Sequence, residues 1–336
     1  MLDLNRLNRI RLSANPRAQK VMGNLVLMPN YDLPPRVKID FEGFDNLPNE
    51  PVIFALNHTD RYNYWPFQYK LWRSLDRYTA TWVKGKYYEN PALGQFMEVM
   101  NNIPTVSRGY LIARDFQAVC ERTPSGDEYR ALRDAVNSVA GLDAPPYEPS
   151  ALAKVVPAPI LEKARDVLGV AFAPHQEDYP TYINRLFGQM MARFVELNIE
   201  AQQKNLDLLI FPQGTRSIRL SRGRIGMAQM ALYLKAPVIP VGCNGSDKVY
   251  PGNSPIGSPG HIIYRAGEPI YYEDMAEFHI DAPFEPFTAE AESLHYDAFQ
   301  GYIDEVMERI NVLLDPPYQF AEDLESDGVR GGKRFL

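Results

Sequence analysis

Three short apolar runs that end in polar loops constrain the fold of this 336-residue chain more than any other feature. They cover residues 51–56, 206–211 and 238–242. Runs of this length that are apolar on both faces are typical of strands buried in a parallel sheet between layers of helices. We therefore expect an α/β fold in which helices occupy the segments between these runs.

Further strands and helices are expected around these runs. Strands are predicted at 37–41, at 78–83, in a short segment that ends at Arg108, and at 260–266. Apolar residues at helical spacing predict helices near 64–72, 91–100, 226–234 and 296–314. Because strands and helices alternate along the chain, we predict a mixed, largely parallel sheet flanked by helices.

The stretch 110–205 interrupts this alternation. It has a mainly helical pattern without a clear strand, and it is punctuated by Pro124, Pro145, Pro146, Pro149, Pro157 and Pro159. We predict that it is a helical insertion within a main domain at 37–322. An N-terminal amphipathic or helical segment at 1–36 and a flexible tail at 323–336 complete the predicted organisation.

The composition is that of a globular protein, with 45% hydrophobic and 23% charged residues. Cys120 and Cys243 are far apart, which is typical of a reducing compartment and not of a disulfide scaffold. Basic residues are frequent in 1–40 and acidic residues dominate 268–327, a pattern unlike that of a nucleic-acid-binding protein. This division fits orientation at an anionic membrane, and equally an ordinary solvated surface.

Contact with a membrane surface is expected to be peripheral. No window approaches the roughly 18 apolar residues of a membrane-spanning helix, and charged and amide side chains interrupt the N-terminus where a signal peptide would be apolar. Residues 2–12 place leucines among arginines, which predicts either an interfacial helix or a helix packed on its own domain. We expect a cytoplasmic protein at the cytoplasmic face of the membrane.

A histidine follows the first apolar run. His58 stands between a predicted strand and a predicted helix, where rigid backbone can hold it within reach of a substrate. Neutral imidazole is the natural base for an alcohol proton near neutral pH, and it needs a partner on its second ring nitrogen. Asp60 and Asn63 are both close enough in sequence for that role. For this residue taken alone, a structural histidine is the alternative.

The second apolar run continues into a turn of sequence Pro-Gln-Gly-Thr-Arg-Ser at 212–217. Arg219, Arg222 and Arg224 follow within one short loop. Hydroxyls, a guanidinium and exposed backbone N–H groups together suit a phosphate or a carboxylate. A solvated basic loop is the alternative for this segment alone.

Together these segments resemble the glycerolipid (lysophosphatidic acid) acyltransferases, whose four sequence blocks occur in fixed order. The first block, Asn-His followed by four residues and Asp, is similar to 57–63, and the second, which ends in an arginine, is similar to 84–108. The third, Phe-Pro-Glu-Gly-Thr-Arg-Ser, is similar to 211–217, and the fourth, apolar around a proline, to 238–241. Gly-Glu-Pro-Ile at 267–270 is similar to a downstream segment of the family.

The resemblance implies an acyltransferase that moves a fatty acyl group from acyl-CoA or an acyl carrier protein to a hydroxyl of lysophosphatidic acid or a related lysophospholipid. No metal or other cofactor is implied. His58 would be the general base, and Arg108 and Arg216 would hold the phosphate of the acceptor. The implied substrate-binding set is Arg108, Gln213, Gly214, Thr215, Arg216, Ser217 and Pro240.

Two residues depart from the family pattern. Asn63 stands where the family has aspartate, and an amide can accept a hydrogen bond from imidazole without stabilising imidazolium by charge. Gln213 replaces glutamate and removes a charge beside Arg216. These changes leave open a glycolipid, aminolipid or natural-product acceptor, and also a non-catalytic lipid-binding protein on the same fold.

The insertion is a third departure, because 110–205 is longer than the family's gap between the second and third blocks. We predict that the insertion forms a lid over the acyl chain, a docking surface for a carrier protein, or additional helical core. The insertion contains His175 near Glu177 and Asp178. One histidine with adjacent acids is a poor ligand set, so we expect a solvated loop there rather than a metal site.

Overall fold

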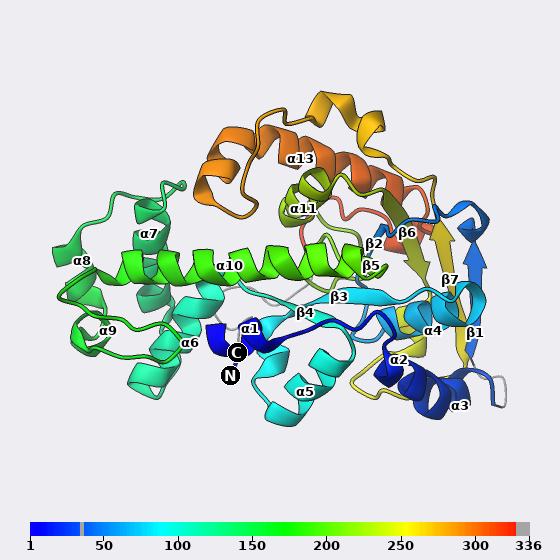
Figure 1. Cartoon of the computed structure of the whole chain (residues 1–336), viewed down its shortest axis with the longest axis horizontal. Helices are drawn as coiled ribbons and strands as arrows, with labels where there is room; N and C mark the ends of the chain where they lie inside the picture. Colours follow the sequence, from blue (N-terminus) through cyan, green and yellow to red (C-terminus); the bar gives the residue numbers. More distant parts are fainter. Residues whose placement is uncertain (34–36, 327–336) are drawn as a thin grey trace.

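Seven strands form one sheet in the computed structural model, which describes residues 1–33 and 37–326 (Figure 1). The strand order is β1-β7-β6-β2-β5-β3-β4. All neighbouring strands are parallel except β6 and β7. The predicted mixed, largely parallel sheet is therefore confirmed. The strands are β1 (Val37–Glu42), β2 (Ile53–Leu56), β3 (Thr79–Lys84), β4 (Asn102–Thr105), β5 (Asp207–Ile210), β6 (Val238–Asn244) and β7 (Gly260–Ala266).

Helices flank the sheet on both faces (Figure 1). Outside the insertion they are α1 (Leu4–Arg9), α2 (Arg17–Met22), the π helix η1 (Gly23–Leu27), α3 (Met28–Tyr31), α4 (Tyr64–Leu75), α5 (Pro91–Val99), α11 (Gly226–Leu234), α12 (Ser246–Val249) and α13 (Ala289–Asn311). Short 3₁₀ helices are η2 (Phe44–Asn46), η3 (Gly85–Tyr88), η4 (Tyr272–Phe278) and η5 (Pro316–Tyr318). The last long helix begins earlier than predicted, because the Thr288 side chain accepts a hydrogen bond from Ala291 N and caps it there.

The central strands send alternate side chains to two hydrophobic cores, one on each face of the sheet. Ile53 and Ala55 of β2 enter the core formed with α10, α11 and α13, whereas Phe54 and Leu56 enter the core formed with α3 and α4. Successive side chains of a strand point to opposite faces, so a strand with a core on each side is apolar at every position. This explains why the apolar runs are continuous in the sequence.

The insertion is helical, as predicted. Its helices are α6 (Arg108–Cys120), α7 (Gly126–Val139), α8 (Pro149–Val155), α9 (Ala158–Glu162) and α10 (Tyr179–Gln203). Helices α6 to α9 form a lobe at one end of the molecule, and α10 runs from this lobe across to the sheet (Figure 1). A buried ion pair joins α6 to the segment before α10: Arg165 Nε lies 2.9 Å from Asp115 Oδ1 and Nη2 lies 2.6 Å from Oδ2. The Arg165 guanidinium also lies 4.5 Å from the ring centre of Phe172.

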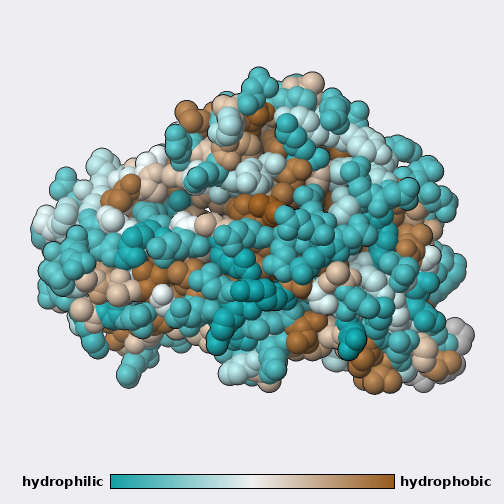
Figure 2. Space-filling model, in the orientation of Figure 1, coloured by the Kyte–Doolittle hydropathy of each residue, from teal (hydrophilic) through white to brown (hydrophobic). Residues whose placement is uncertain are grey.

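The N-terminal segment packs on its own domain. Leu2, Leu7, Ile10 and Leu12 are all buried, so of the two alternatives for 2–12 the structure shows the packed helix. Apart from Met1, the exposed large apolar side chains of this segment lie on and after α2, namely Val21, Leu25, Val26 and Leu33. Figure 2 shows apolar surface over α2 and α3, at the lower right of the view. None of the described helices has the length and apolar character that a membrane span needs.

The C-terminal segment lies along the loop after β5. Leu220 N donates to Tyr318 O (2.9 Å), and Ala321 N donates back to Leu220 O (2.9 Å). Most of the tail predicted at 323–336 lies outside the described residues, as does the domain boundary predicted at residue 36. The division into these segments stays a prediction.

Replacing Arg165 with methionine is expected to destabilise the protein by about 3–5 kcal/mol, because the Asp115 carboxylate would stay buried without its partner. Chemical denaturation monitored by circular dichroism measures this change. The matched control is Arg130→Met, which removes an exposed ion pair with Asp127 and should cost less than about 1 kcal/mol. Equal losses for the two variants would contradict the prediction.

Candidate active site

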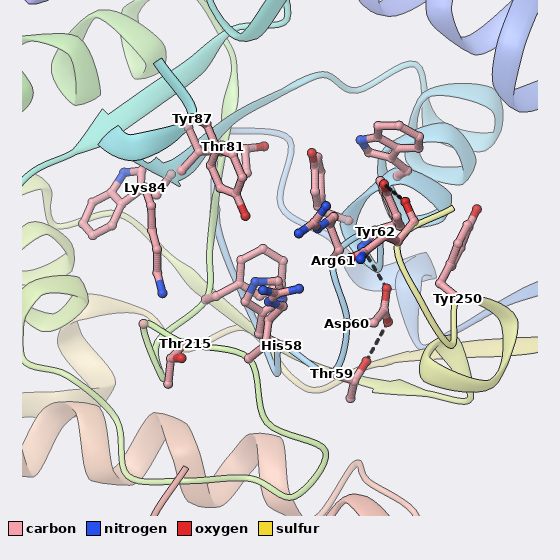
Figure 3. A pocket seen from close by; sticks show the side chains of 18 of the residues that line it. His58, Thr59, Asp60, Arg61, Tyr62, Thr81, Lys84, Tyr87, Thr215 and Tyr250 are labelled. Atoms are coloured by element: carbon pink, nitrogen blue, oxygen red, sulfur yellow. Dashed lines mark hydrogen bonds between the residues drawn. The ribbon is translucent and has the colours of Figure 1, made fainter. Parts of the chain in front are cut away.

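The carboxyl ends of β2, β5 and β3 lie next to one another, because these strands are parallel neighbours. The loops that leave these strands, together with α5 and residues 247–253, enclose a cavity of about 1070 Å³ (Figure 3). Open α/β sheets bind ligands in this position, beyond the carboxyl ends of strands whose connections diverge. The cavity is therefore the candidate active site.

His58 lies in this cavity with one ring nitrogen engaged. Its Nδ1 is 3.0 Å from Asn63 Oδ1, while Asn63 Nδ2 donates to Asn57 O at 2.8 Å. Because the amide nitrogen is already the donor to a carbonyl, the amide oxygen is the acceptor for His58 Nδ1–H. This tautomer leaves Nε2 unprotonated and able to accept a proton. The imidazole also stacks on Phe211, with ring centres 4.0 Å apart.

Asp60, the other candidate partner, does not contact the His58 ring. Its Oδ1 accepts a hydrogen bond from Tyr62 N (2.8 Å) and its Oδ2 from Thr59 Oγ1 (2.9 Å). These bonds turn the carboxylate toward a different part of the cavity wall (Figure 3). Of the two alternatives from the sequence, Asn63 is the residue that contacts His58.

The loop after β5 clamps the backbone of His58 from both sides. His58 N donates to Gln213 Oε1 (2.9 Å), and Ser217 N donates to His58 O (2.8 Å). Gln213 is 1% exposed, and its Nε2 donates to Ser221 Oγ at 3.2 Å. Gln213 and Ser217 thus lie behind the cavity wall and fix the position of His58. Because the side chain of Gln213 is a neutral amide, no charge is buried at this position.

Burial lowers the pKa of His58 to about 3; the hydrogen bond to Asn63 opposes this shift, and the charges of Arg216 and Lys84 add to it. A cationic imidazole would lose its hydration in this site, so the neutral form is favoured. His58 is consequently neutral across the physiological pH range and can act as a base without first losing a proton.

Four basic side chains line the same cavity: Arg61, Lys84, Lys86 and Arg216. Burial lowers the pKa of Lys86, and the neighbouring charges of Arg216, Arg114 and Arg61 lower it further. Like charges held together in a partly enclosed site produce a positive potential that attracts anions. Gly214 and Thr215 complete this side of the wall.

Besides Gln213 and Ser217, two more members of the predicted substrate-binding set lie outside the cavity wall. Arg108 begins α6 instead of ending a strand, because Ser107 caps that helix by accepting from Tyr110 N. Its Nε donates to Asn184 Oδ1 (2.8 Å), and its guanidinium lies 4.2 Å from the ring centre of Phe187. Pro240 is buried in β6.

Sequence reasoning missed Arg61 and Lys86 as site residues. Arg61 comes three positions after His58, and Lys86 comes two positions after the end of β3. Both residues closely follow predicted strands, and this position indicates the candidate site, because the carboxyl ends of neighbouring parallel strands meet at one edge of the sheet. Lys84 was noted only as part of a sequence block.

The cavity also has an apolar end. Its wall consists of Trp82, Val83, Leu93, Phe96, Met97 and Ile210 from β3, α5 and β5. Trp82 is held in place by its Nε1, which donates to Asn198 Oδ1 at 2.7 Å. The described cavity wall includes no residue of the 110–205 insertion, whose buried side chains instead extend the core; His175 is exposed there.

Comparisons with known proteins assign no family to the chain. No family model matches it, and no curated protein sequence matches it. Among solved structures, it is similar to the crystal structure of the 1-acyl-sn-glycerophosphate (LPA) acyltransferase PlsC from Thermotoga maritima, with 14% identity. The match covers 91% of this chain and 80% of that chain, with a TM-score of 0.36. A match at this identity and TM-score assigns neither activity nor substrate.

Replacing Asn63 with aspartate is expected to raise the pKa of His58, because an adjacent carboxylate stabilises imidazolium. In the wild type, the His58 ring signal in NMR spectra should not titrate between about pH 8 and pH 5, whereas in Asn63→Asp it should. Signals are assigned by their loss in His58→Ala. Asn24→Asp adds the same charge on the surface and serves as the control. A wild-type midpoint near the ordinary histidine value would contradict the burial argument.

Proposed function

We propose that the protein is an O-acyltransferase that moves a fatty acyl group from an acyl-CoA or acyl-carrier-protein thioester to a hydroxyl of lysophosphatidic acid or a related lysophospholipid. The observation that carries this proposal is a neutral His58, fixed through Nδ1, in one cavity with an apolar end and four basic side chains. The ordered sequence blocks at 57–63, 84–108, 211–217 and 238–241 support it.

The reaction requires one proton acceptor and a well-placed hydroxyl. Nε2 of His58 takes the proton of the acceptor hydroxyl while its oxygen attacks the thioester carbonyl carbon. The carbon–sulfur bond then breaks, and the imidazolium returns the proton to the leaving thiolate. Asn63 keeps the ring in the tautomer this step needs. Because both substrates are held in one cavity, no covalent acyl-enzyme is required.

The phosphate of the acceptor is proposed to bind the basic cluster. Arg216 keeps the role predicted from the sequence, and Arg61, Lys84 and Lys86 join it because they line the same cavity. Arg108 is left out of this role, since it contacts Asn184 and Phe187 instead. The apolar end of the cavity suits a fatty acyl chain, because its wall of aromatic and aliphatic side chains is the usual lining of lipid pockets.

Replacing His58 with alanine is expected to lower kcat about 10²- to 10⁴-fold, because the hydroxyl loses its base. Radiolabelled palmitoyl-CoA and lysophosphatidic acid provide the assay. The matched control is His261→Ala, a surface histidine paired with Asp40, which should keep full activity. Equal product from His58→Ala and wild type would remove His58 from the mechanism. No product with any lysophospholipid or glycolipid would favour a lipid-binding protein.

A membrane surface is the proposed location of the lipid substrate, at the cytoplasmic face. We define the apolar patch as Val21, Leu25, Val26, Leu33 and Ile256, which are between 46% and 72% exposed. Gly257 N donates to Asn30 Oδ1 at 3.1 Å, which ties the Ile256 loop to α3. Residues 251–253 of the same loop line the cavity, so a membrane bound at the patch lies beside the site.

Leu25→Asp is expected to weaken binding to anionic lipid vesicles by about tenfold or more, because one apolar side chain no longer inserts. Vesicle flotation measures the bound fraction. Leu294→Asp, at a residue 68% exposed on α13, is the matched control and should bind as the wild type does. Unchanged flotation of Leu25→Asp would show that another surface meets the membrane.

A further inference from the structure

The cavity continues past His58 into an end that the acyl-transfer step does not use. We call it the carboxylate end; its wall consists of Asp60, Arg61, Tyr62, Trp65, Asp247 and Tyr250. In Figure 3, Asp60, Tyr62 and Tyr250 lie on one side of His58, while Lys84 and Tyr87 lie on the other. Any molecule that fills the cavity therefore meets two chemically different ends with the base between them.

Aromatic rings form one wall of the carboxylate end. The ring centre of Tyr62 lies 4.8 Å from that of Trp65 and 5.4 Å from that of Tyr250. The two hydroxyls already have partners in the protein: Tyr62 Oη donates to Asn253 O at 2.7 Å, and Tyr250 Oη lies 2.6 Å from Tyr31 Oη. These residues thus contribute ring faces, which are flat, apolar and electron-rich, to a bound molecule.

Charged side chains face these rings. Asp60 and Asp247 bring two carboxylates; Asp247 Oδ1 accepts a hydrogen bond from Tyr318 Oη at 2.7 Å. A carboxylate has about four acceptor positions, so both can accept further hydrogen bonds. Arg61 Nε is buried and has no hydrogen-bond partner among the described residues. A buried donor without a partner is unfavourable, and an oxygen atom of a ligand would satisfy it.

This combination discriminates among the groups that a lipid acceptor can present. An acyl chain would leave the carboxylates and the guanidinium desolvated without partners. A second phosphate would be repelled by Asp60 and Asp247. An ammonium group would be attracted by these carboxylates, but it has no acceptor atom and would leave Arg61 Nε without a hydrogen-bond partner. A ring with several hydroxyls donates to the carboxylates, accepts from Arg61 and lays its C–H face on the aromatic rings.

We propose that the carboxylate end binds a hydroxyl-rich ring, a sugar or cyclic polyol, in the head group of the acceptor. Arg61 belongs to both the basic cluster and the carboxylate end, so a phosphate bound at Arg61 can carry an attached polyol ring into the carboxylate end. This inference rests on the proposed acyltransferase function and names the class of its acceptor.

The test compares acceptors that share an acyl chain and differ in head group. With one acyl donor, kcat/KM for lysophosphatidylinositol is expected to exceed that for lysophosphatidic acid by about tenfold or more, the value of one added charge-assisted hydrogen bond. Asp247→Asn should remove that preference, measured as the ratio of kcat/KM for the two acceptors in the same protein preparation. Trp65→Leu, which removes a ring face, is the second variant, and Asp127→Asn on the insertion surface is the control. Equal or better use of lysophosphatidic acid, or a preference for lysophosphatidylethanolamine, would overturn the proposal.

A binding experiment separates this proposal from the enzymatic one. In the His58→Ala protein, calorimetry compares myo-inositol 1-phosphate with glycerol 3-phosphate, neither of which needs acyl transfer. Tighter binding of inositol phosphate, lost in His58→Ala/Asp247→Asn, would support the carboxylate end even if no acceptor were acylated. Equal binding of the two phosphates would overturn it even if acyl transfer to lysophosphatidic acid were found.

Discussion

The hydrogen bonds between the loop after β2 and the loop after β5 hold the rest of the site in place. His58 N binds the Gln213 side chain, and Ser217 N binds His58 O. These contacts exist because β2 and β5 are parallel neighbours, which brings two loops more than 150 residues apart to the same edge. With the backbone of His58 fixed on both sides, the hydrogen bond to Asn63 fixes the orientation of its imidazole ring. The basic side chains of the cavity thus lie around a histidine whose position is fixed.

The groups around His58 favour the neutral form of its imidazole ring. Asn63 supplies no negative charge, and Arg216 and Lys84 are positive, so nothing adjacent stabilises imidazolium. In the proposed reaction, His58 would therefore hold the proton only briefly and pass it to the leaving thiolate, which is a base.

The sequence contained enough information for the sheet and for the position of His58 after β2, and less for the rest. Continuous apolar runs identified β2, β5 and β6 because both faces of those strands are buried. The strand predicted to end at Arg108 ends at Thr105 instead, because the Ser107 side chain caps a helix that begins at Arg108. Arg61 and Lys86 escaped notice because their proximity depends on strand order, which a single sequence does not reveal. The burial of Leu7 and Ile10 likewise depends on tertiary packing, since exposed and packed amphipathic helices have the same pattern.

The contact between Leu220 and the segment at 318–321 has a consequence for biosynthesis. The loop that clamps His58 is itself supported from one side by residues about 100 positions later in the chain. On the ribosome, β2, β5 and their loops emerge well before this support, so the loop that clamps His58 lacks it until the end of translation approaches. A nascent chain whose sheet has emerged without α13 would expose the apolar core that α13 covers to solvent, and it would depend on chaperones during that interval.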